Sequence, residues 1–218
     1  MNQLSLKFSL IITSVALAAT LAGVWLAEIY RGRDARAALL PNQVVTIYPD
    51  PKLLTAFQLT DQRNRAFDPA SLKGKWTFLF FGFTHCPDVC PSTLAVLAQV
   101  RDSIGKIAAD AEKIQFVLVS VDPHRDTLPK LGQYVEYFNA NFLGVTGDNA
   151  QIAALATQLG AAYEVAIGPG NYPVYHSSAV FLLDPQARNH AVFAAPHDAE
   201  AIGKRFKVVR QLAAGHAT

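Results

Sequence analysis

Both cysteines of this 218-residue chain, Cys86 and Cys90, lie in one short stretch, FFGFTHCPDVCPSTLAVL at residues 80–97. A proline follows each of them, and three residues separate them. The run WTFLFFGF at 76–83 is continuously apolar, which predicts a buried strand. The segment behind the cysteines predicts a helix, because apolar residues recur at helical spacing: Leu94, Leu97, Val100, Ile104 and Ile107. The cysteines therefore stand where a strand passes into a helix.

Two cysteines at this spacing on the first turn of a helix lie on one face, so both sulfurs can reach one point. A helix N-terminus favours negative charge, and we expect it to lower the pKa of at least the first thiol. Thiolates serve both disulfide exchange and the binding of soft metal ions. The three-residue gap suits two thiolates on one metal and still permits a disulfide. The alternative is a purely structural disulfide, which this position disfavours.

The rest of the chain predicts an α/β domain around this junction. Residues 55–75 alternate and turn like a hairpin that leads to a short helix, and the apolar run 114–122 predicts a second buried strand. Helices are expected over 127–142 and 148–161, a hairpin over 171–193 with its turn at DPQARN, and a last helix over 198–213. This order of elements predicts an α/β sandwich without internal repeats.

The N-terminal segment 8–27 carries no charged residue, and a helix rising about 1.5 Å per residue would carry it across a bilayer core of about 30 Å. We expect a membrane anchor; an export signal cleaved near ALA at 16–18 is the alternative. More positive charge follows the segment, at Arg31, Arg33 and Arg36, than precedes it, which is the reverse of the usual bias. Large domains translocate despite such charges, and motifs described below resemble those of an exported family, so we place the domain on the non-cytoplasmic side, in the bacterial periplasm or its equivalent.

These patterns divide the chain into four parts: an anchor at 1–28, a linker at 29–52, a folded domain at 53–214 and a tail at 215–218. The linker mixes charges, prolines and short apolar pieces without a sustained period. A formal net charge of +2 is too small to indicate a nucleic-acid partner, and no basic stripe with interleaved aromatics is present.

Three motifs in this order resemble the Sco/SenC family: LTDQ…SLKGKWTFLFFGFTHCPDVCPSTL, then VSVDPHRDT, then VYHSSAVFLLDP. The resemblance covers about residues 50 to 214. It implies a thioredoxin-like fold, with a central mixed sheet flanked by helices, in a membrane-anchored copper chaperone of cytochrome c oxidase assembly. It further implies that Cys86, Cys90 and His176 bind copper, and that the client is the dinuclear copper site of oxidase subunit II. No donor of the copper is identified.

The ligand set that the resemblance implies is chemically consistent. Two thiolates suit Cu(I), and an imidazole is acceptable to both Cu(I) and Cu(II). The other histidines receive plainer interpretations: His85 and His124 are not expected to be ligands, and His190, His197 and His216 are expected at the surface. In DPHRDT, Asp122, Arg125 and Asp126 are expected to fix a loop through ion pairs and caps, with partner docking or tuning of the metal site as the alternative.

Two functions from different classes remain. The first is a metallochaperone that is not an enzyme in the turnover sense. The second is a thiol-disulfide oxidoreductase that reduces the copper-site cysteines of the oxidase subunit, with Cys86 as nucleophile and Cys90 as resolving thiol. His176 separates them, because thiol exchange needs no imidazole there. We also expect a disulfide between the cysteines to abolish copper binding, because it removes both thiolate ligands.

Overall fold

Strand β4 (Trp76–Gly82) is buried along its whole length, as its continuous apolar run predicts. Strand β5 (Ile114–Ser120) lies parallel beside it and is buried as completely. Alternate side chains of β4 enter opposite layers, so that Phe78 belongs to one core cluster and Leu79 to the other. A strand that is covered on both faces needs apolar residues at almost every position, which explains the absence of alternation.

The computed structural model describes residues 20–23, 45–105, 113–166, 168 and 172–215. In this part of the chain β4 and β5 are central in an eight-stranded sheet of order β1-β10-β9-β4-β5-β6-β2-β3. The other strands of this sheet are β1 (Val45–Leu53), β2 (Leu59–Asp61), β3 (Ala66–Phe67), β6 (Leu143–Thr146), β9 (Val180–Leu183) and β10 (Arg188–Phe193). β4, β5 and β6 run parallel, and the other neighbours pair antiparallel, so the sheet is mixed.

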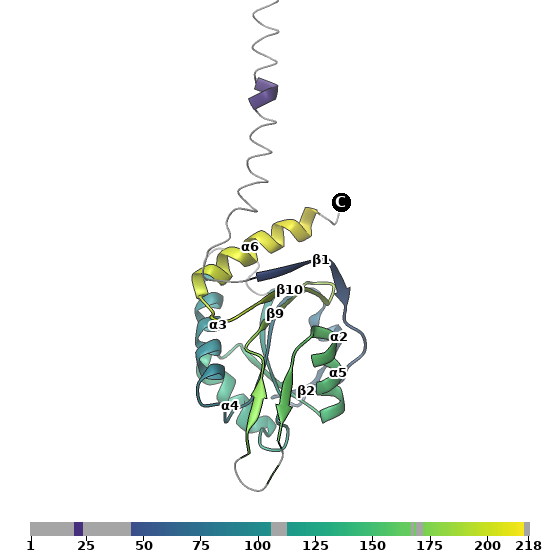
Figure 1. The fold of residues 1–218 in the computed structure, drawn as a ribbon, viewed down its shortest axis with the longest axis vertical. Coiled ribbons are helices and arrows are strands. Elements are labelled where there is room, and N and C mark those ends of the chain that lie inside the picture. The colour runs from purple at the N-terminus through teal and green to yellow at the C-terminus, as the bar shows by residue number, and fades with distance from the viewer. Residues whose placement is uncertain (1–19, 24–44, 106–112, 167, 169–171, 216–218) are drawn as a thin grey trace, which may run out of the picture. The chain divides into compact units, whose positions relative to one another are not determined.

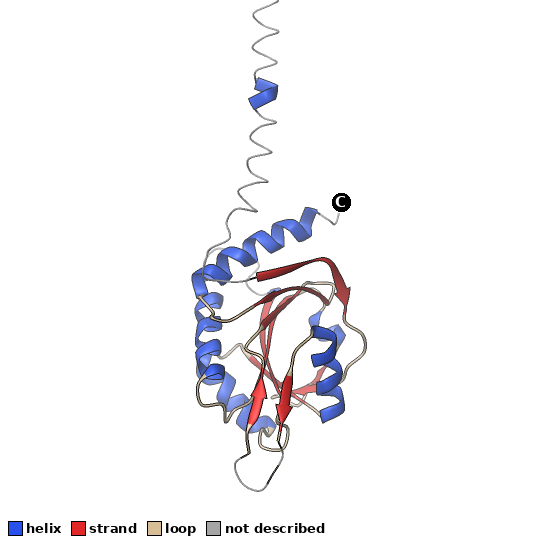
Figure 2. Ribbon diagram, in the orientation of Figure 1, coloured by secondary structure: helices blue, strands red, loops and turns tan. Residues whose placement is uncertain are grey.

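Helices cover both faces of this sheet (Figures 1 and 2). One face carries α3 (Val89–Gly105), α4 (Leu128–Phe138) and α6 (Ala199–Gly215), whose apolar residues join the core cluster of Phe78. The other face carries α2 (Pro69–Leu72) and α5 (Asn149–Leu159), which join the cluster of Leu79. The predicted α/β fold with a central mixed sheet flanked by helices is confirmed.

The helix behind the cysteines forms as its spacing predicts. Four of the five apolar residues expected on its inner face are buried: Leu94, Leu97, Val100 and Ile104. The fifth, Ile107, lies outside the described residues. Burial of this stripe fixes the rotation of α3, and with it the direction in which Cys90 on the first turn points.

Four strands were not distinguished in the sequence. Residues 45–52, placed in the linker, form most of β1; it is an edge strand with an irregular register against β10, so it has no continuous apolar run. β6 follows α4 in a segment of four residues that includes Gly144, too short for a strand pattern. β7 (Tyr163–Val165) and β8 (Val174–His176) form a separate hairpin, whose strands of three residues also lack a readable period.

The chain divides into two compact units, Met1–Leu40 and Pro41–Thr218. Of the first unit the structure describes residues 20–23, which are helical. Across all described residues, no helix combines the length and the apolar character needed to span a membrane. Apart from residues 20–23, the predicted anchor at 8–27 lies outside the described part of the chain.

Candidate metal centre

The two cysteines lie in the loop after β4 and on the first turn of α3. Neither forms a disulfide; Cys86 is partly exposed and Cys90 is completely buried. The backbone N–H of Cys90 donates to Cys86 Sγ at 3.3 Å, and the Cys86 N–H donates to the carbonyl of Phe83 at 3.3 Å. An amide that the start of the helix leaves without a helical partner therefore points at the first sulfur. This arrangement agrees with the predicted strand-to-helix junction.

His176 reaches the same point from the end of β8. Its Nε2 lies 3.2 Å from Cys90 Sγ, and its Nδ1 lies 3.0 Å from the carbonyl oxygen of Ser177. A carbonyl only accepts hydrogen bonds, so Nδ1 carries the ring proton and the lone pair of Nε2 faces the sulfur. The ligand atoms of Cys86, Cys90 and His176 all lie within 4.8 Å of one another, and no other such cluster of three was found among the described residues.

Aromatic rings hold the imidazole in place. The His176 ring packs edge-on against Phe80, at 5.7 Å between centroids, and against Phe83, at 5.8 Å. Burial lowers the pKa of His176, because the charged imidazolium loses its hydration. The hydrogen bond to Ser177 opposes this shift without reversing it. The ring is thus held neutral, which is the form that binds a metal.

Burial has the opposite effect on the second thiol. Desolvation raises the pKa of Cys90, and the neighbouring sulfur of Cys86 raises it further. For Cys90, burial therefore outweighs the helix N-terminus. Without a metal this residue is held as a thiol, and a metal ion must displace its proton to bind.

Gly82 makes room for this buried sulfur. A Cβ atom at residue 82 would lie 2.8 Å from Cys90 Sγ and 3.0 Å from atoms of both Leu118 and Phe80. The last residue of β4 must therefore lack a side chain for Cys90 to occupy its position.

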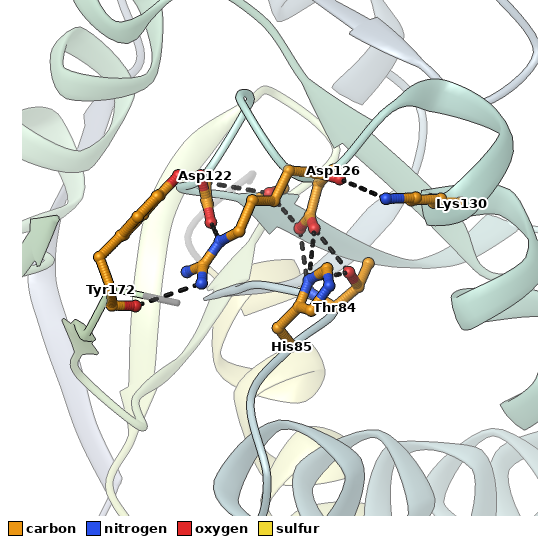
Figure 3. Close-up of polar contacts among 8 residues, drawn as sticks. Thr84, His85, Asp122, Asp126, Lys130 and Tyr172 are labelled. Atoms are coloured by element: carbon orange, nitrogen blue, oxygen red, sulfur yellow. Dashed lines mark hydrogen bonds and ion pairs between the residues drawn. The ribbon is translucent and has the colours of Figure 1, made fainter. Parts of the chain in front are cut away.

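A cluster of carboxylates lies beside the cysteine loop, at the end of β5 (Figure 3). Asp126 is completely buried and accepts hydrogen bonds from the backbone N–H of Thr84 at 2.9 Å, from Thr84 Oγ1 at 2.5 Å and from Ser120 Oγ at 2.6 Å. These bonds attach the loop before Cys86 to the neighbouring strand. Asp126 thus makes the loop-fixing contacts expected of the DPHRDT motif.

The second carboxylate holds the segment that leads to His176. Asp122 pairs with Arg125 and accepts a hydrogen bond from Tyr172 Oη at 2.7 Å. Arg125 donates to the carbonyl of Tyr172 at 3.2 Å and lies over its ring, 3.9 Å from the centroid. The same guanidinium lies 5.6 Å from the centroid of Phe83, which packs on His176. Tyr172 was not identified from the sequence, because no local pattern signals a bond to Asp122.

The remaining described histidines lie away from the ligand cluster. His85 turns toward Thr84 Oγ1, 3.1 Å from its Nδ1, and toward Asp126, as Figure 3 shows. His124 lines a separate cavity between the end of β5 and α5. The prediction that His190 lies at the surface is wrong: it is 6% exposed, packed against Trp76 and near Asp184, because its position on β10 faces the core.

His197 is also less exposed than predicted. It is partly buried, and its Nε2 lies 2.6 Å from the carbonyl oxygen of Ser178. His216 lies outside the described residues.

Comparisons with known proteins agree with this geometry. A protein of Stutzerimonas stutzeri, whose name describes it as copper-binding, is 37% identical over 163 residues, which are 74% of this chain and 78% of that protein. The mitochondrial SCO2 homolog of Bos taurus is 35% identical over 189 residues, 83% of this chain and 66% of that protein. The crystal structure of Arabidopsis thaliana ScoI with copper bound superposes with a TM-score of 0.67 at 31% identity, covering 73% of this chain and 99% of that one. Residues 46–211 match the family model SCO1/SenC, and the chain belongs to this family.

Proposed function

We propose that this protein is a copper metallochaperone that carries one copper ion at Cys86, Cys90 and His176. The observation that carries the proposal is the convergence of two sulfurs and an imidazole nitrogen within 4.8 Å. The donor set fits copper: two soft thiolates suit Cu(I), and the nitrogen keeps Cu(II) acceptable. The Nε2 lone pair already faces the Cys90 sulfur. Relatives described as copper-binding or solved with copper bound support the same ion.

The client and the setting are part of the proposal. The copper is delivered to the dinuclear copper site of cytochrome c oxidase subunit II by ligand exchange in a docked complex. Partial exposure of Cys86 supports such an exchange, since an incoming ligand reaches the metal from that side. The segment 8–27 anchors the protein in a membrane, with the domain on the non-cytoplasmic side.

Copper titration of the reduced protein tests the site. One Cu(I) per chain is expected, and Cys86→Ala or Cys90→Ala should abolish tight Cu(I) binding. His176→Ala should weaken copper retention, of Cu(II) above all. The two thiolates that remain suit Cu(I), whereas Cu(II) depends more on the imidazole nitrogen. His124→Ala, an exposed histidine on a separate cavity, is the matched control. Undiminished affinity in both cysteine variants would eliminate the site.

A second function is favoured by one observation: the two thiols are free, close together and unequal in exposure. The outer thiolate of Cys86 would attack a client disulfide and form a mixed disulfide, releasing one client thiolate. Attack by Cys90 would then release the second client thiol and leave a Cys86–Cys90 disulfide. His176→Ala separates the two functions in a strain that lacks oxidase assembly: full rescue by a variant that has lost copper would support the reductase.

The same disulfide gives an expected switch. Oxidation of Cys86 with Cys90 consumes both thiolate ligands, and a single imidazole does not retain Cu(I). Titration of the oxidised protein should therefore show no tight copper site, and reduction should restore it. Equal copper affinity in both redox states would contradict this prediction.

A further inference from the structure

A cavity of about 350 Å³ lies between β1, β10 and the carboxyl end of α5. The register of the two strands shifts beside it: Ile47 pairs with Ala191 and Lys52 with Asn189, so residues 48–51 of β1 lie opposite residue 190 alone. Such a bulge bends the strand away from its neighbour. The volume is near the lower end of the range for small-molecule sites, about 300–1,000 Å³. None of the residues that line the cavity belongs to the metal centre or to the carboxylate cluster.

A buried amide forms part of the cavity wall. Asn189 is 7% exposed, and its Oδ1 is buried without a hydrogen-bond partner among the described residues. A buried polar atom without a partner costs stability, and most such atoms in native proteins have one. Leucine would fill nearly the same space at residue 189 without that cost. The Asn189 oxygen is therefore an acceptor that a donor in the cavity can satisfy.

Two exposed side chains of opposite charge, Asp50 and Lys52, line the same cavity. They alternate along β1 with Tyr48, so all three lie on one face of the strand. Neither charged side chain forms an ion pair or a hydrogen bond with another described residue. The last turn of α5, which ends at Gly160, adds the partial negative charge of a helix carboxyl end. The cavity therefore offers partners to a cation and to an anion at once.

The cavity also has an apolar part. Leu159 is 3% exposed and the side chain of Tyr48 is half-buried, and both line it. Small-molecule sites typically combine apolar walls with a few polar groups that fix the orientation of the ligand. A ligand that uses every one of these features carries an ammonium group, a carboxylate and an aliphatic body. An α-amino acid with an aliphatic side chain has this combination.

We propose that this cavity binds a free α-amino acid with an aliphatic side chain. The ammonium group of the ligand donates to Asn189 Oδ1 and pairs with Asp50, and its carboxylate pairs with Lys52. A simple amine leaves Lys52 without a partner, and a simple carboxylate leaves the Asn189 oxygen unsatisfied. This inference is independent of the proposed copper function, because the two sites share no residue.

Titration calorimetry of the full chain with three matched probes tests the proposal. L-leucine carries both charges, isoamylamine is leucine without the carboxylate, and isocaproate is leucine without the ammonium group. We expect one L-leucine per chain. Isocaproate should bind about 10- to 100-fold more weakly, because it lacks the charged donor to the buried Asn189. Isoamylamine should bind about 2- to 5-fold more weakly, because it lacks only the partner of the exposed Lys52.

Variants of the lining residues should follow the same order. Asn189→Leu should lower the L-leucine affinity about 10- to 100-fold without lowering the melting temperature, because the Asn189 oxygen has no bond to lose. Asp50→Asn and Lys52→Met should each lower it about 2- to 5-fold, as expected for exposed ion pairs. Lys73→Met, an exposed lysine outside the cavity, is the matched control. All four variants should bind copper like the wild type.

Absence of saturable L-leucine binding to the wild type would overturn the proposal. Equal affinities for the three probes would show an apolar depression that does not recognise the charged groups, which also overturns it. Wild-type affinity in Asn189→Leu would do the same, and if that variant does not fold, wild-type affinity in the exposed Lys52→Met decides against the carboxylate contact. Failure of the wild type to bind copper would overturn the proposed function and leave this inference unaffected.

Discussion

Two clusters stand at the carboxyl ends of neighbouring parallel strands, and their polar atoms are satisfied very differently. After β5, the carboxylates of Asp122 and Asp126 accept hydrogen bonds from hydroxyl, amide and guanidinium donors of the protein itself. After β4, two sulfurs and an imidazole nitrogen converge on one point. The Cys90 amide donates to Cys86 Sγ, and Cys90 Sγ lies 3.2 Å from His176 Nε2.

This difference distinguishes a structural cluster from a binding site. Groups that already have partners contribute to stability and gain little from a ligand. The two sulfurs and the imidazole Nε2 contact mainly one another, and a metal ion that displaces the thiol protons can replace these contacts. The carboxylate cluster therefore holds the two chain segments, and the sulfur cluster is the proposed metal site.

The largest expected effect comes from breaking the carboxylate cluster. Asp126→Asn places an amide N–H₂ where Thr84 or Ser120 now donates, so at least one hydrogen bond to a buried charge is lost. We expect a loss of about 3 kcal/mol in the free energy of unfolding, the upper range for such a bond. Urea unfolding measures it, with the exposed Asp88→Asn in the same loop as control.

The folded fraction of Asp126→Asn should still bind one copper ion, since no ligand has changed. Equal unfolding midpoints for the wild type and Asp126→Asn would show that the cluster does not hold the loop. Normal stability with copper lost would mean instead that Asp126 acts on the metal site directly.

A somewhat smaller effect is expected from a change at Gly82, the residue of β4 that lies against the Cys90 sulfur. Gly82→Ala puts a methyl group 2.8 Å from Cys90 Sγ, so the sulfur or the strand must shift. Overpacking of a tight core costs about 1–3 kcal/mol, and here it also moves a ligand. Copper affinity and stability should therefore fall together.

Gly168→Ala is the control for this variant, because among the described residues its added methyl comes within 4 Å of the Ala166 carbonyl oxygen alone, at 3.9 Å. Chelator competition and urea unfolding are measured for both variants. A Gly82→Ala protein with unchanged copper affinity would show that Cys90 can move without loss of the site.

Local pattern predicted the framework of the site well. The apolar run 76–83 and the helical spacing behind it place Cys86 and Cys90 at a strand-to-helix junction, and the structure has that junction. Both signals are strong because each segment is buried along a complete face or on both faces. The short strands β6 and β8 gave no such signal, since three or four residues carry too little pattern.

Residues that contact the site from distant parts of the sequence could not be predicted from local sequence patterns. His176 lies 86 residues from Cys90, and only a family resemblance drew attention to it. Tyr172 meets Asp122 across 50 residues. The burial of His190 was also missed. The register of β10 shifts between Asn189 and Ala191, and in such a strand the neighbouring strand decides which side chains face the core.

A modest effect is expected from the link between the carboxylates and the hairpin of His176. Tyr172→Phe removes the hydrogen bond to Asp122 Oδ1 and leaves the Arg125 contact with the Tyr172 backbone. The expected loss is about 1 kcal/mol, typical of one partly exposed hydrogen bond. Urea unfolding of Tyr172→Phe is compared with Tyr175→Phe, whose side chain is 64% exposed. A loss as large as that of Asp126→Asn would make Tyr172 part of the core of the cluster.

The smallest effect concerns pH and lies outside both clusters, at His197. Burial lowers its pKa, while the bond to Ser178 opposes the shift. The folded protein therefore binds this proton less readily than the unfolded chain, whose histidines titrate near 6.5. As pH falls through about 6.5 the unfolded chain gains the proton first, so stability is full above that pH and decreases below it. The lowered pKa values of Asp61 and Asp184 act only below 3.8 and do not enter this window.

Metal-free protein should thus unfold more easily at pH 5.5 than at pH 7.5, and His197→Gln should reduce that difference. The reduction is a fraction of the roughly 1.4 kcal/mol that one pKa unit represents, because burial at His197 is incomplete. The measured quantity is the difference in the free energy of unfolding between the two pH values, so a loss of packing that is equal at both pH values cancels.

His176, whose pKa is also lowered by burial, accounts for part of the remaining difference. Bound copper should suppress that part, because a coordinated imidazole does not take up the proton. The exposed His124→Gln serves as control. A pH difference in His197→Gln as large as in the wild type would show that His197 does not contribute to the acid sensitivity.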